Sequence, residues 1–325
     1  MNSSETNCGN TWAIVLAAGE GSRLHSLTTT ESGIAIPKQF CSLHGDQSLL
    51  REALQRAEAV ASPANTCIVV AHHHRRWWDP ELAAEPKSNI IVQPSNRGTA
   101  NGILLPLLHI MARDPDARIV LLPSDHHVRD EPVLAAVLQE AVLKLGGRRN
   151  HVLLLGIYPE EADPDLGYIV PGGGDGSAVW TVSRFVEKPN VPLAQVLVAA
   201  GALWNAFIVA AHAQALLQMF AQCVPRIVTD MRSVIEHNPC TGDAPDVVID
   251  LYRSLPNKDF SRQILQHTTS VLRLLPVKHC GWSDLGTPQR VAKVLRRLPR
   301  LHYVEDEGLR RRSGLLSLAT QYARQ

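Results

Sequence analysis

Short apolar segments alternate with longer helical patterns along the first half of this chain, and this alternation restricts the fold more than any other feature. The apolar segments are rich in Val, Ile and Leu without strict alternation, which is typical of strands covered on both faces. Alternation of this kind favours a doubly wound α/β fold with a mostly parallel, Rossmann-like sheet. The expected strands are 12–16, 66–70, 89–92, 118–122 and 151–156, and the expected helices between them are 47–60, 99–112 and 132–145.

The pattern changes after residue 168. A glycine-rich stretch at 171–176 predicts a turn or hairpin tip, and residues 220–260 are helical and loop-like without clear boundaries. We expect one main domain over 1–290 and a C-terminal helix and tail over 291–325, with no separate second domain. The later strands are expected at 179–185, 207–210 and 272–277, and the later helices at 192–200, 212–220 and 288–298.

Composition excludes several classes of partner. The chain has 325 residues and a formal net charge of +1, so no strong field attracts nucleic acid or a membrane surface. The six cysteines lie far apart without CxxC spacing, which indicates free thiols in a reducing cytoplasm. The polar N-terminus lacks a signal-peptide pattern, and no apolar run approaches a membrane span, so we expect a cytoplasmic protein.

A glycine-rich turn, LAAGEGSRL at 16–24, follows the first expected strand. Its glycines allow the backbone to pass close to a ligand, and its amide groups can point at phosphate oxygens. Arg23 adds a planar fork for phosphate, and Lys38, in the PKQF segment at 37–40, adds a compact positive charge. The turn fits neither a Walker loop nor a dinucleotide fingerprint. The expected nucleotide contacts here are Ala18, Gly19, Gly21 and Ser22.

Two more unusual loops follow expected strands, and the carboxyl ends of such strands meet at one edge of the sheet. In the first of these loops Gln93 can present its amide to a base, Gly98 allows close backbone approach, and Thr99 starts a helix. Thr99 as a simple N-cap and Gly98 as a turn residue are the alternative. In the second loop Asp125 can hold Mg²⁺ or can cap the next helix.

The glycine turn and PKQF together resemble the signature of the sugar-1-phosphate nucleotidylyltransferases, most closely that of the mannose-1-phosphate guanylyltransferase branch. Later segments match the same family in order, namely GYI at 167–169, FVEKP at 185–189, WN at 204–205 and GWSDLG at 281–286. The resemblance implies catalytic roles for Arg23, Lys38 and Asp125. It also implies a sugar-binding subregion in the second half, with contacts from Gly167, Glu187, Lys188 and Asn205. Asp284 is implied to share Mg²⁺ with Asp125.

The family resemblance implies transfer of a nucleotidyl group from a nucleoside triphosphate, with GTP favoured, to a sugar 1-phosphate, with mannose 1-phosphate favoured. Another base or hexose is the nearest alternative. A catalytically silent nucleotide-sugar-binding subunit is a second one, because Asn101, Gly102, Ala206 and Phe207 depart from the family pattern. A homodimer is expected from the general frequency of symmetric dimers.

Two clusters are discounted as sites. Neighbouring residues of an extended segment point to opposite faces, so His72, His73 and His74 are expected to be surface histidines rather than ligands of one ion. Trp77 and Trp78 are expected to belong to a helix that packs on the sheet, with Arg75 and Arg76 in solvent.

Overall fold

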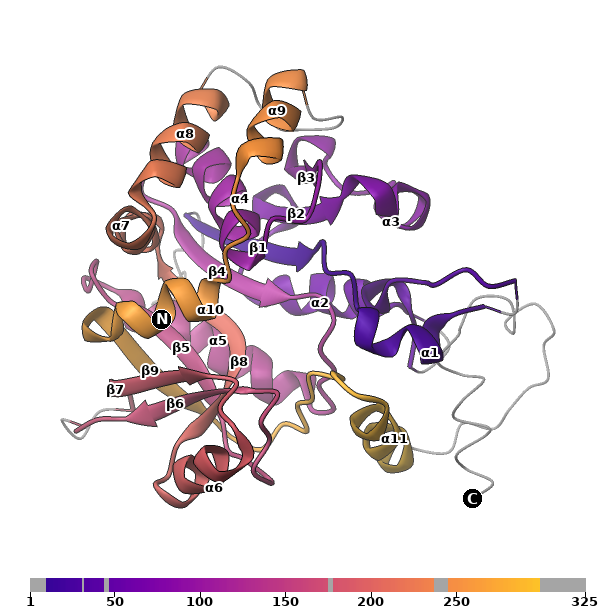
Figure 1. The fold of residues 1–325 in the computed structure, drawn as a ribbon. Coiled ribbons are helices and arrows are strands. Elements are labelled where there is room, and N and C mark those ends of the chain that lie inside the picture. Colours follow the sequence, from indigo (N-terminus) through magenta and orange to yellow (C-terminus); the bar gives the residue numbers. More distant parts are fainter. Residues whose placement is uncertain (1–9, 31, 44–46, 175–177, 237–244, 299–325) are drawn as a thin grey trace, which may run out of the picture.

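The computed structural model describes residues 10–30, 32–43, 47–174, 178–236 and 245–298. Nine strands of this part of the chain form a single sheet in the order β3-β2-β1-β4-β8-β5-β9-β7-β6 (Figure 1). The strands are β1 (Thr11–Ala17), β2 (Thr66–Ala71), β3 (Ile90–Gln93), β4 (Arg118–Pro123), β5 (Val152–Ile157), β6 (Gly167–Pro171), β7 (Trp180–Glu187), β8 (Leu203–His212) and β9 (Leu272–Val277).

Helices cover both faces of the sheet, which confirms the doubly wound α/β class. One buried apolar cluster joins the sheet to α2, α5, α6 and α11, and the other joins it to α4, α7, α8 and α9. Figure 1 shows α7, α8 and α9 grouped beside α4. The helices are α1 (His25–Thr28), α2 (Leu49–Ala57), α3 (Arg75–Glu81), α4 (Thr99–Arg113), α5 (Glu131–Leu145), α6 (Val191–Ala199), α7 (Ala213–Cys223), α8 (Pro225–Ile235), α9 (Asp246–Ser254), α10 (Phe260–Gln263) and α11 (Pro288–Arg297).

The expected parallel pairing describes the first half of the chain, whereas the second half is mixed. Strands β3, β2, β1 and β4 pair in parallel, and β5 pairs in parallel with β9. Strand β8 runs antiparallel to β4, β5 and β6, and β7 runs antiparallel to β6 and β9. The antiparallel pair β6–β7 is the hairpin indicated by the glycines after Pro171. The change in pattern after residue 168 therefore marks a change in strand direction.

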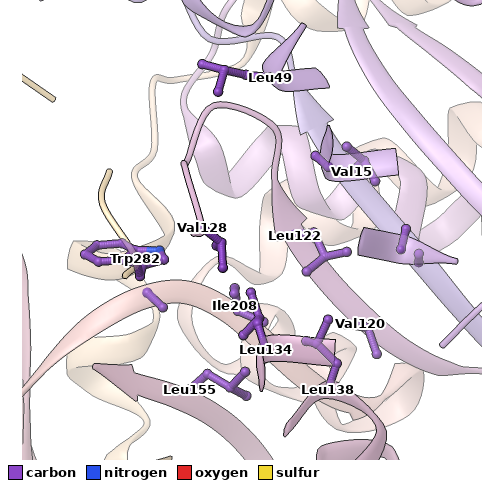
Figure 2. Packing of buried hydrophobic residues seen from close by; sticks show 14 of the residues in the cluster. Val15, Leu49, Val120, Leu122, Val128, Leu134, Leu138, Leu155, Ile208 and Trp282 are labelled. Atoms are coloured by element: carbon purple, nitrogen blue, oxygen red, sulfur yellow. The ribbon is translucent and has the colours of Figure 1, made fainter. Parts of the chain in front are cut away.

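Alternate residues of the central strands enter the two clusters. Val15 and Val120 pack on one face, and Ile14 and Ile119 pack on the other. Figure 2 shows Leu134 and Leu138 of α5 against the first face, close to Ile208. Burial on both faces explains why these strands lack a polar residue at every second position.

The segment at 220–260 that sequence patterns left without boundaries contains α8 and α9, separated in part by residues outside the described ranges, and α10 begins at its end. Helix α11 packs Val291 and Val294 into the apolar cluster that also contains α2, α5 and α6. Residues 299–325 of the expected tail lie outside the described ranges. Among the described helices, none has the length and apolar character needed to cross a membrane.

Candidate active site

The glycine turn lies at the end of β1 and packs directly on Lys38. Gly21 has a φ of +61°, and a Cβ placed on it would lie 3.1 Å from Cβ of Lys38. The buried Gln39 side chain donates from Nε2 to the carbonyls of Ala17, at 2.8 Å, and Gly19, at 3.1 Å. A glycine is required at position 21 both by its backbone conformation and by this contact. The turn is thus attached to the PKQF segment, while Gly19, Ser22 and Arg23 stay exposed and Ala18 is half-buried.

Lys38 connects the two predicted metal ligands. Its Nζ lies 2.8 Å from Oδ2 of Asp125 and donates to the main-chain carbonyl of Asp284 at 2.6 Å. The lysine is 5% exposed, whereas the Asp125 side chain that it contacts is 36% exposed, so a buried charge meets a carboxylate that solvent can reach. We call Lys38, Asp125 and Asp284 the carboxylate centre.

Main-chain contacts hold the two carboxylate loops together. His127 and Ser283 form an antiparallel bridge in which each amide donates to the other carbonyl at 2.9 Å. The amides of Arg129 and Asp130 both donate to the carbonyl of Cys280. The expected convergence of Asp125 and Asp284, which lie far apart in sequence, is therefore a property of the described fold.

Charges around the centre keep both carboxylates ionised. Burial by itself raises the pKa of Asp125, but Lys38 and His126 outweigh it and leave the pKa below its usual value. Burial also raises the pKa of Asp284, and His126, when its ring is protonated, together with Arg290 reverses the shift. Burial lowers the pKa of His126 to about 4, so this ring is neutral at pH 7. The centre therefore presents two anionic side chains at neutral pH.

Arg290, at the start of α11, is a site residue that sequence motifs did not identify. It contacts Oδ1 of Asp284 at 2.5 Å and Oδ2 of Asp163 at 2.6 Å. Asp165 lies 3.5 Å from Arg290 and 3.7 Å from Arg23, so it connects this network to the glycine turn. A single arginine at the start of a helix carries no distinctive pattern, and its partners at 163 and 165 precede the GYI segment. Its role was visible only in the fold.

The donor set of the carboxylate centre fits the divalent cation that the family implies. Two ionised carboxylates, carried by loops that are bridged through His127 and Ser283, are the protein ligands that Mg²⁺ prefers when substrate phosphates supply the rest. Arg290 and the amide of Gly286 use Oδ1 of Asp284, and Lys38 uses Oδ2 of Asp125. Each carboxylate has a second oxygen to offer a cation.

Residues 93–102, which we call the base loop, are packed against a segment that sequence patterns did not place. Gly98 has a φ of +85°, and the carbonyl of Lys258 fills the space that a Cβ would need. The amide of Phe260 donates to Oγ1 of Thr99 at 2.8 Å, and the amide of Ala100 donates to the carbonyl of Lys258. Gly98 is therefore required by protein packing in the described conformation, and Thr99 both starts α4 and anchors α10.

The Gln93 side chain is directed into the protein. It is 5% exposed and donates from Nε2 to the hydroxyl of Tyr252 on α9 at 3.1 Å. Gly102 lies against the same amide group, and a Cβ placed on Gly102 would lie 3.2 Å from Nε2 of Gln93. Asn101 donates to the carbonyls of Arg97 and Pro256. These contacts give Asn101 and Gly102, two departures from the family pattern, a packing role in this chain.

Three of the four predicted sugar contacts lie together on neighbouring strands. Gly167 of β6 pairs with Glu187 of β7, and a Cβ on Gly167 would lie 2.6 Å from Oε2 of Glu187 and 3.4 Å from Cβ of Asn205. Asn205 accepts from the amide of Phe207, whose φ is +57°, beside the irregularity where β8 pairs with β5. The unusual Ala206 and Phe207 therefore coincide with a local distortion of the strand.

Burial distinguishes Glu187 from Lys188. Burial, with help from Asp259, raises the pKa of Glu187 to about 7. The Lys188 side chain is 43% exposed, with Nζ 4.0 Å from Oε1 of Glu187, and its φ of +49° turns it away from the strand direction. The Glu187 carboxyl can therefore gain or lose a proton near neutral pH, and it lies beside the solvent-accessible ammonium group of Lys188.

The structure agrees with the expectation for the tryptophan cluster at 77–78 and differs from the expectation for the histidine cluster at 72–74. Trp78 is buried and donates to the carbonyl of Ala71, while Arg75 and Arg76 lie over Trp78 and Trp77, as expected for a helix packed on the sheet. The expectation of surface histidines is wrong for His74, which is 6% exposed. Residues 72–74 form a tight 3₁₀ turn instead of an extended segment, so the alternation argument does not apply.

Comparison with known proteins identifies the family. The nucleotidyl transferase family model matches residues 12–299. This chain belongs to the nucleotidyl transferase family. It is 30% identical over 279 residues to the xanthan biosynthesis protein XanB of Xanthomonas campestris pv. campestris, covering 84% of this chain and 57% of that protein. It is 27% identical over 286 residues to a mannose-1-phosphate guanylyltransferase of Escherichia coli, covering 85% of this chain and 58% of that protein. The chain thus spans somewhat more than half the length of these relatives.

Solved structures support the fold. A protein of Thermus thermophilus described as a mannose-1-phosphate geranyltransferase superposes with a TM-score of 0.76 at 23% identity, covering 90% of this chain and 81% of that one. A UDP-glucose pyrophosphorylase in complex with UDP-glucose superposes with a TM-score of 0.53 at 15% identity, covering 88% and 97%. The described sheet and its flanking helices are therefore the fold of this family.

Proposed function

We propose that this chain transfers a nucleotidyl group from a nucleoside triphosphate to a sugar 1-phosphate and releases pyrophosphate. GTP and mannose 1-phosphate are the favoured substrates, by analogy with the guanylyltransferase relatives. The observation that carries the proposal is the position of Lys38, which contacts the glycine turn and both carboxylate loops at once.

In the proposed reaction an oxygen of the sugar phosphate attacks the α-phosphorus in line, and pyrophosphate leaves. Such a reaction needs alignment and charge neutralisation rather than a covalent nucleophile. The glycine turn and Arg23 bind the triphosphate, Lys38 stabilises charge near the α-phosphate, and Lys188 orients the sugar phosphate. Glu187 and Asn205 contact sugar hydroxyls beside Gly167, whose missing side chain lets the Glu187 carboxylate lie against the strand.

Asp125 and Asp284 would hold Mg²⁺, and when bound the ion supplies charge neutralisation and orientation of phosphate oxygens. Lys38 and Arg290 keep both carboxylates ionised and fixed before substrates arrive. The cysteines in the described ranges are free thiols, in keeping with the proposed cytoplasmic location. We also propose that the chain forms a homodimer, and light scattering tests this by measuring the molar mass in solution.

Pyrophosphate release with GTP, ATP, UTP and CTP against several hexose 1-phosphates tests the function. The highest kcat/KM is expected for GTP with mannose 1-phosphate. Another preferred pair would change the substrate assignment and leave the reaction class intact. Nucleotide-sugar binding without pyrophosphate release from any pair would favour the silent subunit and overturn the proposal.

A further inference from the structure

Two histidines of the 72–74 turn converge with a carboxylate from the glycine turn. Nε2 of His73 lies 3.2 Å from Oε1 of Glu20, and Nε2 of His74 lies 3.6 Å from Oε2 of Glu20. One ligand atom from each of the three residues lies within 4.8 Å of the others. The turn that follows β2 is thereby brought beside the loop that follows β1.

These separations suit a small cation. Ligand atoms about 2.0–2.1 Å from a tetrahedrally coordinated ion lie about 3.3 Å from each other. The spacing from Glu20 to each histidine is close to this value, so modest side-chain movement brings all three atoms to bonding distance. Two imidazoles and one carboxylate are a donor set typical of Zn²⁺, and such a set leaves a fourth position for water.

The two histidines of the cluster differ in burial. His74 is buried, and its ring packs edge-on against Phe40, with the centroids 6.2 Å apart. Its Nδ1 has no hydrogen-bond partner among the described residues, so packing rather than a hydrogen bond fixes the ring. The side chains of His73 and Glu20 are 49% and 43% exposed, which gives an ion a route from solvent.

We propose that Glu20, His73 and His74 form a site for a divalent transition-metal ion of the Zn²⁺ class, separate from the carboxylate centre. Glu20 lies between Gly19 and Gly21, so an ion bound there connects the glycine turn to the end of β2.

The experiment is a titration of the untagged full chain with Co²⁺, which gives visible absorption bands in a nitrogen–oxygen site. Excess Mg²⁺ is present throughout, because Mg²⁺ prefers oxygen ligands and occupies the carboxylate centre. Zn²⁺ should displace the Co²⁺ signal. The variants are His73→Ala and Glu20→Gln, whose half-exposed side chains can be replaced without opening the core. His72→Ala is the matched control from the same turn.

We expect one Co²⁺ per chain in the wild type and in His72→Ala. Binding should weaken at least about 10-fold in His73→Ala and in Glu20→Gln, since even loss of an outer-shell partner has effects of this size. The proposed site would be overturned if His73→Ala bound Co²⁺ as tightly as the wild type. It would also be overturned if His72→Ala weakened Co²⁺ binding as much as His73→Ala does. Because the readout is metal binding, it is independent of whether the proposed transferase reaction occurs.

Discussion

Asp125 of the carboxylate centre and the base loop both follow strands of the parallel half of the sheet, yet their side chains are directed differently. Lys38 and Asp125 contact each other across a site that remains partly open. Gln93 is directed inward and is held by Tyr252, which lies far along the chain. Strand ends thus determine where a residue lies, while packing by a distant segment determines which way its side chain points.

The largest expected effect is on the centre. Lys38→Met should lower kcat by about 10²–10³-fold, because one preorganised charge is removed from the transition state. Steady-state kinetics measure this, with Lys144→Met on the exposed side of α5 as the control. A stability loss without any change in activity per folded molecule would mean that Lys38 only supports the fold.

The two carboxylates should act as one unit. Asp125→Asn and Asp284→Asn should each raise the Mg²⁺ concentration for half-maximal activity by about 10-fold or more. The double variant should be affected less than the product of the two effects, since both act on one ion. Asp116→Asn, before the other end of β4, is the control. Full activity in excess EDTA would show that Asp125 and Asp284 do not hold a metal ion that the reaction needs.

Glu187 provides a test of burial in the second half of the chain. An acid whose folded pKa is raised loses stability as pH rises between its unfolded value, about 4.5, and its folded value, about 7. Glu187→Gln lacks this loss, so its free energy of unfolding relative to wild type should increase by about 1–3 kcal/mol from pH 4 to pH 8. Urea denaturation at several pH values measures the difference. A constant difference across this range would show that Glu187 titrates normally.

The smallest effect should come from the base loop. Gln93→Ala should change the ranking among the four triphosphates, and Tyr252→Phe should change it in the same direction by about 5-fold, the value of one hydrogen bond near 1 kcal/mol. Phe keeps the packing of Tyr252, so it isolates the contact to Gln93. If both variants weaken every triphosphate equally, the loop is a general support and does not select the base.

These contrasts explain what sequence could predict. The position of Asp125 follows from strand order, because main-chain geometry places the ends of parallel strands at one edge. Lys38 and Asp284 were indicated by family motifs alone. The inward direction of Gln93 depends on Tyr252 of α9, a helix that lies far along the chain in the segment whose boundaries sequence patterns did not give. Arg290 stands outside every motif. The prediction for the histidine turn was wrong because its backbone is a 3₁₀ turn, and local sequence does not distinguish this from an extended end.

The position of β9 has a consequence for how the chain is made. This strand, Leu272–Val277, lies between β5 and β7, although it follows them by many residues. Strands β1 to β4 can pair as soon as residue 123 has left the ribosome, but the gap between β5 and β7 stays open until β9 emerges. The second half therefore exposes unpaired edges of β5 and β7 until residue 277 has been made, and it is the half in which nascent chains are most exposed to aggregation and most dependent on chaperones.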